Sequence, residues 1–168
     1  MIVRRAQITD ASQLAEVSVN SIRATYERLV PNSVLESLSI KDNEAKFRQR
    51  IAEGHSHMFV AEAYSQIIGF ATLGDKVEKG EQGLTGQLYA IYLDPKWWRR
   101  GAGWLLWNEA IGCARSLGWI RLKVKTATGN TRACRFYEAM GCVANVTSIK
   151  ESDYLGVTVE TIQYILVL

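Results

Sequence analysis

The sequence predicts a single α+β domain in which a mixed sheet is layered with helices. Three observations support this fold class. Strand patterns and amphipathic helix patterns alternate along the chain, hairpins are expected near both ends, and one strand-helix-strand unit lies between them. The length of 168 residues, with 48% apolar and 22% charged residues, suits one globular domain over residues 1–168.

The N-terminal half is expected to contain helices followed by a hairpin. Thr9 and Asp10 are residue types that cap helices, and Pro31 cannot continue one. Two apolar strand candidates, 58–63 and 67–73, flank a short polar turn. The expected elements before this hairpin are a strand over 2–6, a helix from 9–10 to about 30, a short helix over 32–39 and an amphipathic helix over 42–53.

The C-terminal half is expected to contain the strand-helix-strand unit, one more helix and a final pair of strands. Gly118 and Gly141 are suited to end helices, because glycine accepts the left-handed conformation found there. Leu122 and Val124 alternate with cations, which predicts a strand with one buried face. The expected elements are a strand over 88–93, a helix over 101–117, a strand over 120–126, a helix over 130–140, and strands over 142–149 and 157–167.

A strand, a basic loop and two glycines follow one another between residues 88 and 103. The apolar strand runs into Asp94 and Pro95, and the next helix begins at Gly101-Ala102-Gly103. The first amide groups of a helix have no partner within it and lie at the positive end of its dipole. This turn is therefore suited to hold a phosphate group.

The charges of the chain are unevenly distributed. Residues 96–135 contain nine Lys or Arg and a single acid, Glu109, so this segment carries +8 while the whole chain carries +3 and the remainder −5. Such a separation attracts an anionic ligand to one part of the surface. Nucleic acid is not expected as the partner, because no recognition motif accompanies the basic residues. A compact polyphosphate fits better.

Two other phosphate-binding classes do not fit the glycine turn. Leu106 stands where a dinucleotide fingerprint has its third glycine, and the following strand ends in Lys125-Thr126 instead of an acidic residue for the ribose. The sequence GxxxxGK, which marks a P-loop, is absent. The expected ligand is therefore neither a nicotinamide cofactor nor a P-loop nucleotide.

The cysteines and histidines indicate no metal site. Cys113, Cys134 and Cys142 are odd in number and lack CxxC spacing, so they are expected to pack as reduced thiols. His55 and His57 have no further ligands at a suitable spacing. No apolar stretch is long enough to span a membrane and no secretory signal is recognised, so the cytoplasm is the expected location.

Two motifs in this region resemble those of the GNAT superfamily of acyl-CoA-dependent N-acetyltransferases. Trp98-Arg99-Arg100-Gly101-Ala102-Gly103 is similar to the family's Gln/Arg-x-x-Gly-x-Gly/Ala, with Trp98 at the Gln/Arg position. The segment 130–141 follows the family's Asn-x-x-Ala-x-x-Phe-Tyr-x-x-x-Gly. Both motifs occur in the family's order, and the resemblance covers at least residues 88–142.

The resemblance implies a GNAT-like fold and acetyl-CoA as co-substrate, without a metal. The fold would be a mostly antiparallel twisted sheet of about six or seven strands, splayed at the fourth and fifth and flanked by about four helices. The pantetheine arm would pair with the strand at Ile91, Tyr92 and Leu93. The other residues expected to contact the cofactor are Arg99, Arg100, Gly101, Ala102, Gly103, Trp104, Asn130, Ala133 and Tyr137.

The spacing of the second motif leaves two interpretations of its residues. Asn130 and Tyr137 are seven apart and share a helix face with Ala133. Asn130 is suited to cap the helix, to contact the cofactor, or to do both. From the residues alone Tyr137 is a core tyrosine, whereas the resemblance makes it functional.

Acetyl transfer to an amine needs a proton acceptor, an oxyanion donor and an acid for the departing thiolate. The resemblance gives Tyr137 the role of the acid, and a backbone N–H near Leu93 is the candidate oxyanion donor. Gln87 stands where many family members have a glutamate base, and an amide cannot accept the proton. The open candidates for the base are Glu160, Glu62, Asp75, His55 and His57, acting through water, or an acceptor of low pKa.

The expected acceptor is a primary amine of a small molecule. Its pocket is expected at the first helix and the following loop, 21–31, opposite the loop 76–86 and the last hairpin. The expected contacts are Tyr26, Gln87 and Tyr89, and Tyr154 is a further candidate for the pocket wall. The alternatives are a peptide or protein amine, or a non-catalytic acyl-CoA-binding module, which Gln87 and Trp98 favour. The resemblance is compatible with a homodimer.

The tryptophans give one further expectation. Trp104 and Trp107 lie one helical turn apart and are expected in the core. The adjacent Trp97 and Trp98 cannot both face inward, so one of them is expected to cover the cofactor or a subunit contact.

Overall fold

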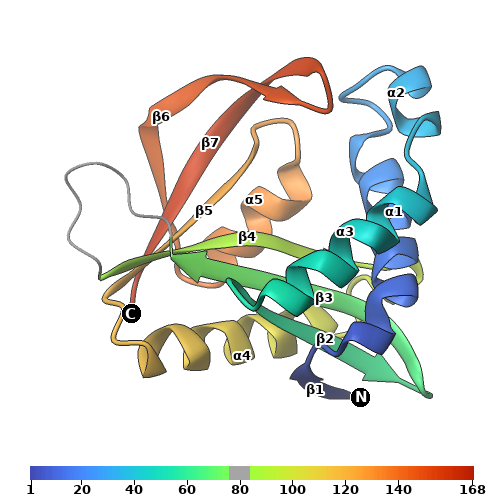
Figure 1. Ribbon diagram of the computed structural model, residues 1–168. Coiled ribbons are helices and arrows are strands. Elements are labelled where there is room, and N and C mark those ends of the chain that lie inside the picture. The colour runs from blue at the N-terminus through green and yellow to red at the C-terminus, as the bar shows by residue number, and fades with distance from the viewer. Residues whose placement is uncertain (76–83) are drawn as a thin grey trace.

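A computed structural model describes residues 1–75 and 84–168 of the chain. Its strands form one seven-stranded sheet in the order β1-β2-β3-β4-β5-β7-β6 (Figure 1). All neighbouring strands are antiparallel except β4 and β5. The predicted mixed, mostly antiparallel sheet is therefore confirmed.

The elements follow the predicted order with shifted ends. The strands are β1 (Ile2–Arg5), β2 (His57–Ala63), β3 (Gln66–Asp75), β4 (Thr85–Leu93), β5 (Arg121–Ala127), β6 (Val143–Tyr154) and β7 (Val157–Val167). The helices are α1 (Ala11–Tyr26), α2 (Asn32–Glu36), α3 (Ile40–Glu53), α4 (Ala102–Ser116) and α5 (Thr131–Ala139), with 3-10 turns η1 (Ile8–Asp10) and η2 (Pro95–Trp97).

Helices cover both faces of the sheet (Figure 1). Along β2, Met58 and Val60 pack with residues of α1 and α3, whereas Phe59 and Ala61 pack on the other side with α4. A strand that is buried on both faces reads as an apolar run instead of an alternation, which explains the sequence of β2. The two cores fix the sheet between its helical layers.

The central strands β4 and β5 separate after a short parallel pairing. Thr85 to Leu88 lie opposite Arg121 to Val124, and the register between these strands ends there. Beyond this point β4 continues along β3, and β5 continues along β7. The sheet therefore has an opening between the C-terminal halves of β4 and β5, as the resemblance implied for the fourth and fifth strands.

Some local expectations were wrong. Helix α1 ends at Tyr26, four residues before Val30, although Val30 is still buried against α2. Asp10 does not cap α1 with its side chain; its carboxylate instead accepts the backbone N–H of Gln7 in η1. Trp104 is 56% exposed, because the buried stripe of α4 runs through positions four apart, such as Leu106 and Ala110.

Part of the expected acceptor loop 76–86 lies outside the described residues. Of its remainder, Thr85 and Gly86 belong to β4. A Cβ placed on Gly86 would lie 1.8 Å from the Trp119 ring, so this glycine allows the indole to pack directly on the strand. Within 1–75 and 84–168, no helix combines the length and apolar character needed to cross a membrane.

Candidate functional site

The glycine turn opens helix α4 at the end of β4. Gly101 has φ +86° and stands at the N-cap of the helix without a side-chain hydrogen bond to the first turn. The first amide groups of α4 therefore have no side-chain cap at this position, and a helix supplies them no internal partner. A Cβ on Gly101 would meet nothing within 4 Å, so the turn is open. The N-terminus of α4 is accessible to a ligand.

Two further features shape this turn. Gly103 lies close to the side chains of Leu93 and Phe136, because a Cβ there would be 3.4 Å from each of them. Arg99 has φ +60°, a left-handed conformation that is uncommon for a residue with a side chain. Arg99 and Arg100 are both exposed beside the helix start. The predicted combination of free amides and guanidinium groups is thus assembled in one place.

The edge of β4 that borders the opening is not paired with β5 beyond Leu88. The Asp94 N–H donates to the Ile68 carbonyl at 2.9 Å, so the N–H and C=O of Asp94 face β3. The N–H and C=O of successive strand residues point to alternate sides. Those of Leu93 and Ile91 therefore face the opening, and those of Tyr92 face β3. Leu93 and Ile91 can therefore pair with an extended ligand, whereas Tyr92 contributes its side chain.

The side chain of Trp98 crosses the mouth of this opening. Its Nε1–H donates to the Leu93 carbonyl at 3.1 Å. The guanidinium carbon of Arg132 lies 3.4 Å from the centroid of the indole ring. Leu93 ends β4, and Arg132 belongs to α5, which follows β5, so the indole connects the two sides of the opening.

The second motif forms helix α5. The Asn130 side chain accepts the Ala133 N–H at 3.2 Å, which confirms its predicted role as an N-cap. Tyr137 is 5% exposed and lies 6.0 Å, centroid to centroid, from Trp107. Burial raises the pKa of the Tyr137 phenol well above its ordinary value, and the nearby Tyr92 phenol raises it further. The phenol is therefore protonated at neutral pH.

Tyr26 meets two other tyrosines on the opposite side of the opening. The rings of Tyr26 and Tyr154 stack with centroids 4.3 Å apart. Burial is the largest cause that raises the pKa values of Tyr26, Tyr92 and Tyr154. The neighbouring phenols of this group shift these pKa values further. Together with Tyr137, these phenols come from α1, β4, β6 and α5. Figure 1 shows the tip of the β6–β7 hairpin beside α2, where it completes this cluster.

The other two predicted acceptor contacts lie toward the start of β4. Gln87 is paired within the sheet, opposite Gly74 and Lys123. Tyr89 is 47% exposed and its ring lies over Gly74, since a Cβ there would be 3.0 Å from it. The structure thus groups Tyr26 with the C-terminal end of β4 and not with these two residues.

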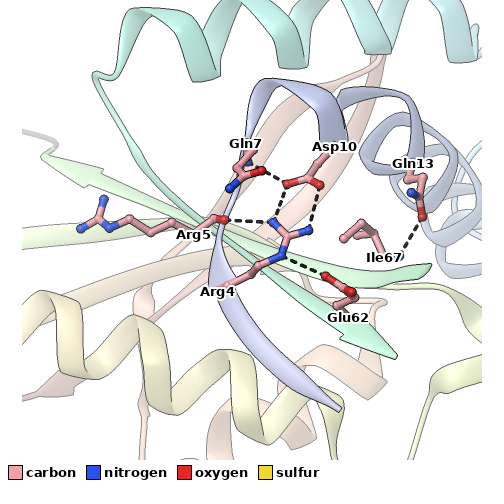
Figure 2. A network of polar contacts seen from close by, with 7 residues as sticks. All are labelled: Arg4, Arg5, Gln7, Asp10, Gln13, Glu62 and Ile67. Carbon is pink, nitrogen blue, oxygen red and sulfur yellow. Dashed lines mark hydrogen bonds and ion pairs between the residues drawn. The ribbon is translucent and has the colours of Figure 1, made fainter. Parts of the chain in front are cut away.

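The candidate bases are dispersed. Glu62 accepts Arg4 Nε at 2.9 Å in a network with Asp10 (Figure 2), on a strand separated from β4 by β3. His57 Nδ1 lies 3.5 Å from Arg5 Nη1. His57 belongs to β2, which β3 separates from β4. Glu160 accepts the Thr128 hydroxyl at 2.8 Å, just beyond the end of β5. Of these three, Glu160 lies closest along the fold to the opening, and the side chain of Asp75 is not described.

Among the described residues, the cysteines and acidic groups form no metal site. Cys113, Cys134 and Cys142 are all unpaired, and burial raises the pKa of the Cys142 thiol to about 11. In the portion of the chain that the structure describes, no three His, Cys, Asp or Glu side chains are grouped to hold a metal ion.

The chain is similar in sequence to one protein family and to one curated protein. A sequence model of the acetyltransferase (GNAT) family matches residues 21–142. The uncharacterized N-acetyltransferase YuaI of Bacillus subtilis (strain 168) is 38% identical over 102 residues, which are 60% of this chain. The match spans only 57% of the length of YuaI.

Solved structures share the fold at low sequence identity. The PaiA N-acetyltransferase of Thermoplasma acidophilum, solved in complex with coenzyme A, superposes with a TM-score of 0.75 at 21% identity, covering 96% of each chain. The protein yncA of Salmonella typhimurium, solved with acetyl-CoA, gives 0.73 at 18% identity over 99% of this chain and 93% of its own. At these identities the likeness shows the fold alone.

Proposed function

Because the chain belongs to the GNAT family of acetyltransferases, we propose that it transfers acetyl from acetyl-CoA to a primary amine of a small molecule by direct attack of the amine. Three features support this proposal: Gly101 begins α4 without a side-chain cap, the pairing of β4 with β5 ends at Leu88, and Tyr137 is a buried phenol on α5, the helix that follows β5. Each supplies a part that the reaction needs.

The cofactor would be held mainly by main-chain groups. The amides of Ala102, Gly103 and Trp104 would bind the diphosphate, with Arg99 and Arg100 beside them. The pantetheine arm would extend along β4 and pair with the peptides of Leu93 and Ile91. Ala133 and Asn130 on α5 would border the thiol end. In relatives that were solved with coenzyme A or acetyl-CoA the same fold holds that ligand.

Tyr137 would act as the acid that protonates the departing thiolate. A thiolate of coenzyme A, with an ordinary thiol pKa of about 8.5, leaves more readily when it is protonated. The raised pKa of Tyr137 keeps its proton on the phenol at neutral pH, which is the state that a donor needs. The Leu93 N–H, which faces the opening, would stabilise the tetrahedral oxyanion.

Glu160 is the base that we favour among the candidates. An alkylammonium group with a pKa near 10 must lose a proton before it attacks. Glu160 is exposed on β7, and its carboxylate accepts the hydroxyl of Thr128, the residue that follows β5. Water would relay the proton. Glu62 is already engaged by Arg4 on the far side of β3.

A peptide or protein amine is the second candidate acceptor, favoured by a groove along α1. Two cavities of about 640 and 430 Å³ flank this helix and share Asn20, Asp94 and Lys96 in their walls. The linings contain four carboxylates and two cations, namely Glu16, Glu27, Glu36, Asp94, Arg23 and Lys96. Two adjoining cavities with more carboxylates than cations suit a cationic chain.

A panel of amines assayed by thiol release tests the proposed function. The panel should contain small diamines and aminoglycosides beside lysine-containing and free N-terminal peptides. The expected result is turnover with at least one amine, and a loss of roughly 100-fold in Tyr137→Phe with coenzyme A binding retained. Tyr64→Phe, at a tyrosine that is 90% exposed, is the matched control. Slow release with every amine would favour the non-catalytic acyl-CoA-binding module instead.

A further inference from the structure

Resting on the proposed cofactor site, we propose that Trp98 is a latch that closes the opening between β4 and β5, and that coenzyme A must displace its indole from the Leu93 carbonyl. The family's motif has Gln or Arg at this position, so the indole is a feature of this chain. The latch would set how fast and how tightly the cofactor binds.

The first support is the group that the indole occupies. The Leu93 carbonyl faces the opening, since the neighbouring Asp94 peptide faces β3. A ligand that adds to β4 as an extra strand pairs with this edge. In the structure the same carbonyl accepts Trp98 Nε1–H at 3.1 Å. The indole therefore takes the place of a ligand donor.

The second support is the position of the ring. A carbonyl oxygen has two lone pairs and can accept a second hydrogen bond, so the position of the ring matters as well as its N–H. The indole reaches from Leu93 to Arg132, whose guanidinium carbon lies 3.4 Å from the ring centroid. The half-buried ring and a pantetheine chain along β4 would compete for this carbonyl. Binding then requires the indole to move.

The size of the effect follows from these two contacts. One hydrogen bond of this kind shifts an equilibrium by roughly 2- to 10-fold, and the stacked guanidinium adds to it. A protein whose binding-competent state is only a fraction of the population binds its ligand more weakly by that fraction. The closed latch therefore lowers the apparent affinity for coenzyme A by about this factor.

Stopped-flow binding of coenzyme A tests the latch with Trp98→Phe, which keeps a ring but loses the N–H donor. The variant is expected to bind coenzyme A roughly 2- to 10-fold more tightly, with the gain in the association rate constant. Trp97→Phe is the matched control and is expected to bind like the unaltered protein. A Trp98→Phe affinity equal to or weaker than that of the unaltered protein would overturn the latch.

A second measurement follows the indole in the unaltered protein. The indole N–H resonance of Trp98, assigned by its loss in Trp98→Phe, should be protected from hydrogen exchange and should lose that protection when coenzyme A is added. Protection that persists in the complex would contradict displacement. Absence of coenzyme A binding in every form would overturn the proposed function together with the latch, whereas equal binding in all forms removes the latch alone.

Discussion

Asp10→Asn is expected to destabilise the protein through the network that joins β1, η1 and β2 (Figure 2). The Asp10 side chain is 8% exposed and accepts Arg4 Nη1 at 2.8 Å and Arg4 Nη2 at 2.9 Å. It also accepts the Gln7 N–H at 2.7 Å. An amide in its place lacks the charge that makes these bonds strong, and it leaves the guanidinium with a weaker partner.

The expected loss of stability is about 2–3 kcal/mol. Breaking a fully buried ion pair costs about 3–5 kcal/mol, and a hydrogen bond to a charged group contributes about 1.5–3 kcal/mol. The lower part of this range applies, because Arg4 is 31% exposed and keeps Glu62 as a partner. In a domain of this length such a loss lowers Tm by roughly 5–10 °C.

The effect should depend on pH in one direction. The hydrogen bonds from Arg4 hold the pKa of the Asp10 carboxyl below its ordinary value. Stability from such a depressed pKa is present above the unfolded value, about 3.9, and is lost as pH falls through the folded value. The difference between Asp10→Asn and the unaltered protein is therefore greatest near neutral pH and shrinks below about pH 4.

Urea unfolding at pH 7 and pH 3 measures both quantities. Glu44→Gln is a suitable control, because it removes an i,i+4 pair with Arg48 on the surface of α3, worth about 0.3–0.5 kcal/mol. A loss below about 0.5 kcal/mol in Asp10→Asn at pH 7 would refute the reasoning, since it would equal a surface pair. A difference of the same size at both pH values would refute the assigned role of the charge.

Two further predictions concern the site. Gly101→Ala should lower the free energy of unfolding by about 1–2 kcal/mol in a thermal or urea titration, because Gly101 has φ +86°. A Cβ there would meet no atom within 4 Å, so the loss comes from the backbone conformation alone. An unchanged stability would mean that the turn adopts another conformation. Glu160→Gln should reduce turnover at saturating amine, whereas Glu62→Gln should leave it unchanged; the reverse pattern would assign the base to Glu62.

Much of the fold could be predicted because periodicity reports burial directly. The ends of β3, β7 and α5 lie within about three residues of the expected ones. The end of α1 was missed because Val30 is buried after the helix has ended, and an apolar residue gives the same signal in a packed loop as in a helix. Contacts across the sheet, such as that of Trp119 with Gly86, have no local signal.

The candidate site was predicted only in its local parts. The glycine turn and the N-cap at Asn130 depend on a few consecutive residues. The glycines and the asparagine determine the backbone geometry there. The contact of Trp98 with Arg132 joins residues 34 positions apart, and the meeting of Tyr26 with Tyr154 joins two ends of the chain. Such contacts follow from the topology of the sheet.

Calorimetric titration of the protein with coenzyme A tests the central claim most directly. If the amides at the start of α4 and their neighbouring guanidinium groups hold the diphosphate, one molecule should bind per chain, with an affinity that decreases as salt screens the charges. No heat with coenzyme A or acetyl-CoA at any salt concentration would contradict the account.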